Sequence, residues 1–268
     1  MRIPNVLSIA GSDPSGGAGI QADLKTFSAL GAYGMSVLTA LTAQNTQGVT
    51  AIHSVPASFI AAQCEALFAD IHLDAIKLGM LGEAEAVRTL SDLLKQHRAE
   101  LGTVVLDPVM VAKGGQRLLG DSAIGELRSE LLPLVDLLTP NLPEAAVLLG
   151  QTMAMDEESM RVQGRQLVKL GAQAVLMKGG HLPGDSCPDW LITPSEEVRF
   201  PGVRIASHNT HGTGCSLSAA LAALRPQSSS WSDAIGRAKT WLSEAIRSAD
   251  RLSVGHGMGP IHHFHRWW

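Results

Sequence analysis

Apolar runs of strand length alternate with stretches of helical periodicity along most of the chain. The strand-like runs are rich in Val, Ile and Leu and lie at residues 6–10, 35–41, 75–78, 103–107, 134–139, 174–177, 190–193 and 198–205. Between them, apolar side chains recur at helical spacing, as at Val87, Leu90 and Leu94. This alternation predicts an α/β fold with a mostly parallel central sheet and helices on both faces. The last two runs predict an antiparallel hairpin around Ser195.

The chain has 268 residues, enough for one large α/β domain or two small ones. No composition break, internal repeat or low-complexity linker divides it, so we predict a single domain over residues 1–268. Aromatic residues make up 4% of the chain against 45% hydrophobic residues, so the core is expected to be mostly aliphatic.

Charge and cysteine usage exclude several classes of protein. The formal net charge is −4 and no cluster of Lys and Arg stands out, which argues against a nucleic-acid partner. Cys64, Cys187 and Cys215 lie far apart with no CxxC pair, which argues against a disulfide framework or zinc site and favours a reducing cytoplasm. We expect no secretory signal, because the N-terminus lacks a charged region followed by an apolar one. We also expect no membrane segment, because glycine and proline interrupt the uncharged residues 26–64 before roughly 20 apolar residues accumulate.

Glycine or polar residues follow six of the predicted strands. Because ligands of such sheets bind beyond the carboxyl ends of the strands, these segments are expected to form one binding site. The first, residues 11–19, is rich in glycine but has neither the Gly-Lys-Ser/Thr ending of a P-loop nor the GxGxxG pattern. The other segments are residues 44–45, 79–82, 107–110, 140–144 and 178–181.

Each polar residue also has a purely structural interpretation. Asp107 could cap a turn before Pro108. Asn141 could be the N-cap of a helix over residues 142–149, with Glu144 completing a capping box. Lys178 could be a solvated charge, and Gln44 could hydrogen-bond backbone. These alternatives stay open for each residue alone, but the expected meeting of all these residues at one sheet edge favours a functional role.

The most informative segment is Asn-Thr-His-Gly-Thr-Gly-Cys at residues 209–215. It follows an extended stretch over residues 203–207 and runs into a tightly packed helix, so we expect a glycine turn at a helix N-terminus. Unpaired N–H groups and the helix dipole there favour an anion, such as phosphate. A plain linker and a small buried cysteine are the structural alternatives.

With these segments together, the chain resembles the small-molecule kinases of the ribokinase superfamily. More narrowly, it resembles the hydroxymethylpyrimidine/phosphomethylpyrimidine kinases of thiamine biosynthesis. The resemblance runs essentially end to end and is carried by residues 10–23, 44–46, 77–80, 107–110, 139–141, 144–145, 178–181, 211–215 and 259–265. It implies a ribokinase-like three-layer α/β/α fold.

The resemblance also implies an activity. ATP would phosphorylate the hydroxymethyl group of 4-amino-5-hydroxymethyl-2-methylpyrimidine, and a second ATP would convert the monophosphate to the diphosphate. By the same resemblance Gln44 reads the aminopyrimidine edge. The residues implied to shape the pocket around it are Gly11, Ala18, Asp23, Met80 and Val109.

On the phosphate side, Asn141 and Glu144 match the N-x-x-E element that organises Mg²⁺ and phosphates, with Asp107 and Lys178 as helpers. Gly212, Thr213, Gly214 and Cys215 match the anion hole. By the same resemblance, sugar kinases of this fold usually carry an aspartate base at the position of Cys215. Because a helix N-terminus lowers a thiol pKa, we expect Cys215 to be available as a thiolate base near neutral pH.

Other interpretations remain open. A pyridoxal kinase of the same fold would share nearly all phosphate-side residues and differ around Gln44. A non-catalytic nucleotide-binding protein would need a broken site, yet Cys215, Asn141 and Glu144 are present. The resemblance implies a homodimer, with residues 44–55 as a candidate flap. The C-terminal histidines resemble a metal cluster, but a packed or solvated tail is the favoured interpretation.

Overall fold

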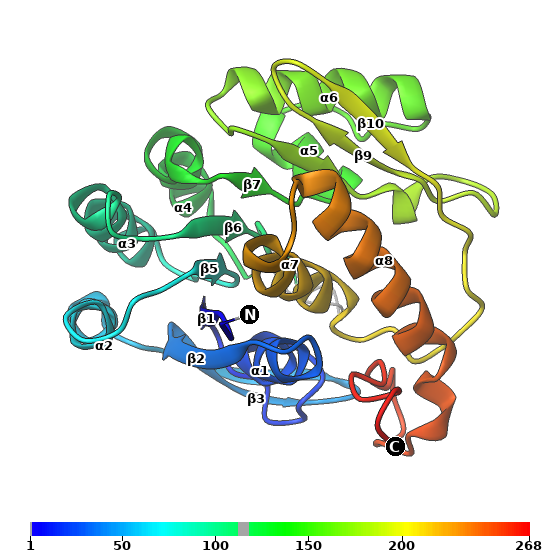
Figure 1. Ribbon diagram of the computed structural model, residues 1–268, viewed down its shortest axis with the longest axis horizontal. Helices are drawn as coiled ribbons and strands as arrows, with labels where there is room; N and C mark the ends of the chain where they lie inside the picture. The colour runs from blue at the N-terminus through cyan, green and yellow to red at the C-terminus, as the bar shows by residue number, and fades with distance from the viewer. Residues whose placement is uncertain (1, 112–117) are drawn as a thin grey trace.

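The computed structural model describes residues 2–111 and 118–268. Within them, eight strands form one twisted sheet in the order β10-β9-β8-β7-β6-β5-β1-β2 (Figure 1). Their bounds are β1 Asn5–Ala10, β2 Tyr33–Leu38, β5 Ala75–Leu78, β6 Thr103–Leu106, β7 Leu137–Leu138, β8 Val175–Met177, β9 Asp189–Ile192 and β10 Glu197–Phe200. From β8 to β2 in this order, neighbouring strands pair in parallel. Strand β9 pairs antiparallel with both β8 and β10. The predicted mostly parallel α/β sheet and the terminal hairpin are confirmed.

Helices cover both faces of the sheet (Figure 1). Because side chains alternate along a strand, Val104 and Leu106 of β6 belong to one apolar cluster and Val105 to the other. On one side lie α2 Ala57–Phe68, α3 Ala84–His97, α4 Asp121–Glu126, α5 Leu142–Leu149 and α6 Glu157–Lys169. On the other lie α1 Gly19–Ala29, α7 Thr213–Leu224 and α8 Trp231–Arg247. The three-layer α/β/α arrangement is therefore also confirmed.

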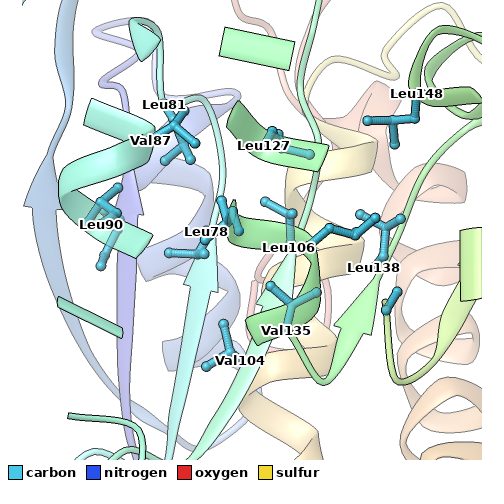
Figure 2. Packing of buried hydrophobic residues seen from close by; sticks show 14 of the residues in the cluster. Leu78, Leu81, Val87, Leu90, Val104, Leu106, Leu127, Val135, Leu138 and Leu148 are labelled. Atoms are coloured by element: carbon cyan, nitrogen blue, oxygen red, sulfur yellow. The ribbon is translucent and has the colours of Figure 1, made fainter. Parts of the chain in front are cut away.

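Aliphatic packing joins the first helical layer to the sheet. Leu78 and Leu106, from neighbouring strands, are buried in the same cluster as Val87 and Leu90 of α3 (Figure 2). The predicted helical spacing of Val87, Leu90 and Leu94 therefore marks the buried face of α3. In the opposite layer, every residue of α7 from Ser216 to Leu224 is buried, because α1 and α8 flank this helix against the sheet. Its N-terminal turn is consequently held at a fixed place.

One predicted strand is wrong. The run at residues 35–41 is not continuous: β2 ends at Leu38, and the chain then leaves the sheet. Thr39 marks this departure, since its N–H donates to Ala10 O and its hydroxyl to Met80 O, 2.6 Å away. The chain continues as a separate antiparallel hairpin of β3 Ala40–Asn45 and β4 Gly48–Ser54. Gln44 therefore belongs to this hairpin and not to an end of the central sheet.

Two further strand bounds are shorter than predicted. The run at 198–205 stops at Phe200, because Pro201 has no N–H to continue the ladder. The run at 134–139 contributes only Leu137–Leu138, since the preceding residues Leu132–Leu134 form a helical turn. The carboxyl end of the first run therefore moves from residue 205 to Phe200, while β7 still ends next to Thr139 and the expected site segment at residues 140–144.

No helix of the described residues combines the length and apolar character needed to cross a membrane.

Candidate active site

A cavity of about 610 Å³ opens at the carboxyl ends of the parallel strands. Its walls come from the loops after β1, β5, β6, β7 and β8, from hairpin β3–β4 and from the start of α7. All but one of the predicted site residues line it: Gly11, Ala18, Gln44, Met80, Asp107, Val109, Asn141, Glu144, Lys178, Gly212, Thr213, Gly214 and Cys215. The fold thus brings together segments that are more than 200 residues apart in the sequence.

The predicted glycine turn over residues 209–215 is present at the N-terminus of α7. Gly212 is the N-cap with φ +76°, and a Cβ there would lie 1.8 Å from the carbonyl oxygen of Gly17. Only glycine allows this close approach in the left-handed conformation. Among the described residues, the N–H groups of Gly214 and Cys215 have no hydrogen-bond acceptor. Two unpaired donors at a helix N-terminus make this turn suited to an anion.

The expected thiolate at Cys215 is a wrong prediction for the free protein. The pKa of this thiol is raised to about 11, mainly by burial and in addition by the carboxylates of Asp107 and Asp23. Lys77 and the amide of Gly19 act in the opposite direction but do not outweigh burial. Cys215 is only partly exposed at the cavity wall, and the helix N-terminus is too weak to outweigh the burial of its thiol, so Cys215 is expected to be protonated at neutral pH.

Three charged side chains form a cluster beside the glycine turn. Lys178 Nζ lies 3.0 Å from Asp107 Oδ1 and 3.8 Å from Glu144 Oε2. A Cβ added to Gly214 would lie 3.6 Å from Lys178 Nζ, so the ammonium group is next to the unpaired N–H groups. Burial alone would lower the pKa of Lys178, but the two carboxylates raise it above its usual value. Lys178 is therefore a permanent positive charge and not a solvated surface residue.

Asn141 and Glu144 form the capping box that was the structural alternative for these residues. Asn141 Oδ1 accepts from Glu144 N at 2.8 Å, and Glu144 Oε2 accepts from Asn141 N at 2.7 Å. Burial raises the pKa of Glu144 to about 7, and Lys178 opposes that rise. The cap does not remove these residues from the cavity, which both of them line.

Asp23 is the one predicted site residue that does not line the cavity. It lies in α1 beneath the cavity floor with no solvent exposure, and its Oδ2 is 2.8 Å from Nζ of Lys77 and 2.5 Å from Oγ of Ser8. Burial raises the pKa of Asp23, and Lys77 opposes the rise. The Asp23 carboxylate neutralises and positions the ammonium group of Lys77, whose side chain reaches the cavity from β5.

On the opposite wall, Gln44 meets a histidine and an aspartate. Thr42 and Gln44 lie two residues apart on β3, so both side chains face the cavity. The register shift between Ala43 and Gln44 leaves Thr50 of β4 as the extra residue. Gln44 Nε2 lies 3.3 Å from His211 Nε2, which lies 2.9 Å from Asp13 Oδ2. The amide of Gln44 is thus held by side chains and not by backbone.

The C-terminal histidines are packed, as expected. His262 and His263 are buried, and His263 Nε2 lies 3.0 Å from Ser216 Oγ. Burial lowers the pKa of His263 to about 3. No group of three or more His, Cys, Asp or Glu within residues 2–111 and 118–268 has the geometry to hold a metal ion.

No role was predicted for Lys77, Asp13 or His211, although all three lie in the motifs described above. Lys77 carried a usable signal, because a charge inside the apolar strand Ala75–Leu78 must have a buried partner. Asp13 and His211 carried none, because their contact joins residues 198 positions apart.

Comparisons with known proteins identify the family of the chain. The family described as Phosphomethylpyrimidine kinase matches residues 13–262. A hydroxymethylpyrimidine/phosphomethylpyrimidine kinase of Escherichia coli is 56% identical over 268 residues, covering 100% of both chains. A solved phosphomethylpyrimidine kinase of Clostridium difficile has 39% identity and a TM-score of 0.80, covering 91% of this chain and 100% of that one.

A pyridoxal kinase of Staphylococcus aureus, solved with AMP-PCP and pyridoxal, has 31% identity and a TM-score of 0.89, covering 100% of this chain and 96% of that one. The fold is therefore shared with pyridoxal kinases, while the sequence matches the pyrimidine kinases more strongly. Taken with the cavity and its charged cluster, these matches show that the chain belongs to the phosphomethylpyrimidine kinase family and is a kinase.

Proposed function

We propose that this protein transfers the γ-phosphoryl group of ATP to the hydroxymethyl oxygen of 4-amino-5-hydroxymethyl-2-methylpyrimidine. A second ATP then phosphorylates the resulting monophosphate to the diphosphate, as a step in making thiamine diphosphate. In each step the acceptor oxygen forms a bond to phosphorus, the bond from phosphorus to the bridging oxygen breaks, and ADP leaves.

One observation carries this proposal: a single cavity has a substrate side and a phosphate side that meet at the start of α7. The substrate side is lined by Gln44, Met80 and Val109, which combine one amide with apolar surface. The phosphate side is lined by Lys178 and Glu144. An alcohol held at Gln44 and a phosphate held at Lys178 would face each other across residues 212–215.

Positioning and charge stabilisation are the main contributions of a protein to phosphoryl transfer. Lys178 would bind the transferring phosphoryl group through its charge, and the N–H groups of Gly214 and Cys215 would donate to its oxygens. Asp107 holds the Lys178 ammonium in place at 3.0 Å, and Ser218 Oγ donates to the other oxygen of Asp107 at 3.3 Å.

Magnesium fits the oxygen chemistry of the phosphate side. Mg²⁺ prefers oxygen ligands and usually keeps several waters. Asn141 Oδ1 and Glu144 Oε2 are engaged in the capping box, which favours contacts to the metal through water over direct ligation. Mg²⁺ bound there would neutralise charge on the phosphates, and Glu144 would hold its hydration shell.

Pyridoxal or pyridoxine is the second candidate substrate, favoured by the TM-score of 0.89 to the Staphylococcus aureus pyridoxal kinase. The experiment is to supply ATP and Mg²⁺ with the pyrimidine alcohol, its monophosphate or pyridoxal, and to follow products by ³¹P NMR. We expect the pyrimidine mono- and diphosphates. Formation of pyridoxal phosphate without a phosphorylated pyrimidine would overturn the main proposal in favour of the second.

We also propose that the protein works as a homodimer in the cytoplasm. Hairpin β3–β4 exposes Leu41 and Ile52 on a segment without Asp, Glu, Lys or Arg, which supports a contact between copies there. Cys64, Cys187 and Cys215 are free thiols, which fits a reducing compartment. Light scattering of the purified protein tests the dimer, and fractionation of cells tests the location.

A further inference from the structure

His211 joins three segments that form the substrate side of the cavity. It comes from the turn before α7, Asp13 comes from the loop after β1, and Gln44 comes from β3. The His211 ring lies against Gly17, where a Cβ would come within 2.4 Å of the ring carbon Cδ2. Only 12% of the His211 side chain is exposed, so the ring is held in one orientation.

The contact with Asp13 determines where His211 carries its proton. Asp13 Oδ2 also accepts from the N–H of Ala18 at 2.8 Å, and Oδ1 accepts from Ser15 Oγ at 2.6 Å. Burial would raise the pKa of Asp13, but the bonds from His211 and Ser15 hold it below its usual value. A carboxylate only accepts hydrogen bonds, so Nε2 of His211 must be protonated and must donate.

This proton restricts the amide of Gln44, whose two orientations have the same shape and differ only by exchange of Oε1 and Nε2. With Nε2 beside His211, two donors face each other at 3.3 Å. In that orientation the single hydroxyl proton of Thr42 would also have to serve both Ser12 O at 2.8 Å and Gln44 Oε1 at 3.3 Å. Both conflicts arise from placing Nε2 of the Gln44 amide beside His211 and Oε1 beside Thr42.

Exchange of the two amide atoms removes both conflicts. Gln44 Oε1 then takes a weaker share, at 3.3 Å, of the His211 Nε2–H that Asp13 Oδ2 accepts at 2.9 Å. The amide N–H donates to Thr42 Oγ1, and the Thr42 hydroxyl donates to Ser12 O. The carboxylate of Asp13 makes Nε2 of His211 a donor, and this donor determines which amide atom of Gln44 faces the ring. The amide keeps one lone pair on Oε1 and one N–H for a ligand.

We propose that Asp13 and His211 are positioning residues that lock the Gln44 amide in this orientation and so make the site select an aminopyrimidine over an oxopyrimidine. This inference rests on the function proposed above. The hydroxymethyl group of the substrate must point to the phosphate side, which sets the orientation of the pyrimidine ring. The substituent at ring position 4 and the neighbouring ring nitrogen therefore each face one atom of the Gln44 amide. A 4-amino ring then offers a donor and an acceptor in the order that the locked amide matches, and a 4-oxo ring offers the reverse order.

The test compares kcat/KM for the 4-amino alcohol and for 5-hydroxymethyl-2-methylpyrimidin-4-one. His211→Phe keeps a flat ring but removes the donor, so the amide becomes free to turn. We expect the amino-over-oxo preference to fall about tenfold or more, the scale of one discriminating bidentate pair, with KM for ATP unchanged. His211→Gln can restore an N–H to Asp13 and should keep most of the preference. His208→Phe is the matched control, because His208 lies in the same segment and is exposed.

Equal losses for both pyrimidines in His211→Phe would overturn the proposal, because His211 would then only support the shape of the site. An unchanged preference would overturn it as well. If neither pyrimidine is phosphorylated by the wild-type protein, the proposed function fails, and competitive binding of the two pyrimidines still tests the selection. Independently of activity, ¹⁵N NMR of the wild-type protein should show His211 protonated at Nε2, and a bare Nε2 would overturn the lock.

Discussion

Lys77 and Asp23 form an ion pair with no solvent exposure on either side chain, with 2.8 Å between Nζ and Oδ2. The pair joins β5 to α1 directly below the cavity. Ser8 donates to the same carboxylate oxygen, while Oδ1 of Asp23 has no partner among the described residues. The cavity floor therefore depends on a charge pair that is only partly satisfied.

Removing one member of this pair is expected to cost more than removing both. Lys77→Met leaves the Asp23 carboxylate buried and uncompensated, which costs about 3–5 kcal/mol for such pairs. Lys77→Met combined with Asp23→Leu removes both charges and should recover most of that loss. Urea unfolding of the two single variants and the double variant measures this difference. Additive losses would show that the two side chains do not act as a pair.

Gln44→Leu should weaken use of the pyrimidine by about 1–3 kcal/mol while leaving KM for ATP nearly unchanged. The reason is that Gln44 offers a donor and an acceptor side by side, and leucine offers neither. Steady-state kinetics with each substrate varied in turn measures both effects. Gln47→Leu is the control, since Gln47 is exposed in the turn of the same hairpin. An unchanged KM for the pyrimidine would remove Gln44 from substrate recognition.

Site residues that directly follow strands of the central sheet could be predicted from the sequence better than those on other elements. Asp107, Asn141 and Lys178 were placed together correctly, because parallel strands bring their carboxyl ends to one edge. Gln44 reached the same cavity by another route, through a hairpin that the charge-free sequence did not separate from β2. A continuous apolar run does not reveal where the chain leaves a sheet, since both parts have strand composition.

Residues that act through distant partners could not be predicted. Asp23 had the right segment but the wrong role, because its partner Lys77 is 54 positions away and no local pattern records the pairing. For Cys215 the helix start was predicted correctly, yet no local pattern shows how far the thiol is buried, and burial is the main cause of its raised pKa.

Glu144→Gln should lower kcat, with partial recovery at high Mg²⁺ and little change in Tm. Glutamine keeps an oxygen that can accept from the N–H of Asn141, so the cap survives, but the charge that would hold the hydration shell of Mg²⁺ is lost. Glu144→Ala is the comparison, because it removes cap and charge and should also lower Tm. A large drop in Tm for Glu144→Gln with normal Mg²⁺ dependence would mean that the capping box is the whole role of Glu144.

The raised pKa of Cys215 can be tested directly by alkylation of the folded protein. The thiolate is the reactive form, and with a pKa of about 11 its population rises about tenfold per pH unit through pH 8–10. Peptide-resolved labelling with iodoacetamide should show this steady rise at Cys215. Cys64, with a pKa raised by burial to about 12, is the internal control and should stay unlabelled. A labelling rate that levels off near pH 8.5 would indicate an ordinary thiol at Cys215.

The same pKa decides when Cys215 can act as a base. A pKa of about 11 makes the thiolate cost about 4 kcal/mol at pH 8, at about 1.36 kcal/mol per unit. A general base contributes about 10²–10⁴-fold, or about 3–5 kcal/mol, so at pH 8 the cost and the gain nearly cancel. Any base role of Cys215 must therefore grow as the pH rises.

The two phosphorylations separate this role from a structural one. The alcohol must lose a proton, whereas the monophosphate, with a second pKa near about 6, is already anionic and needs no base. Replacing the thiol by Cys215→Ala should therefore slow the alcohol step by a factor that increases with pH, up to about tenfold per unit below the pKa of the thiol. The loss in the monophosphate step should stay constant.

Turnover of the alcohol and the monophosphate, supplied separately at pH 7, 8 and 9 to wild type and variant, measures both factors. A base role requires the thiolate, whose population changes with pH. If both losses are independent of pH, Cys215 therefore shapes the anion-binding turn and does not accept the proton.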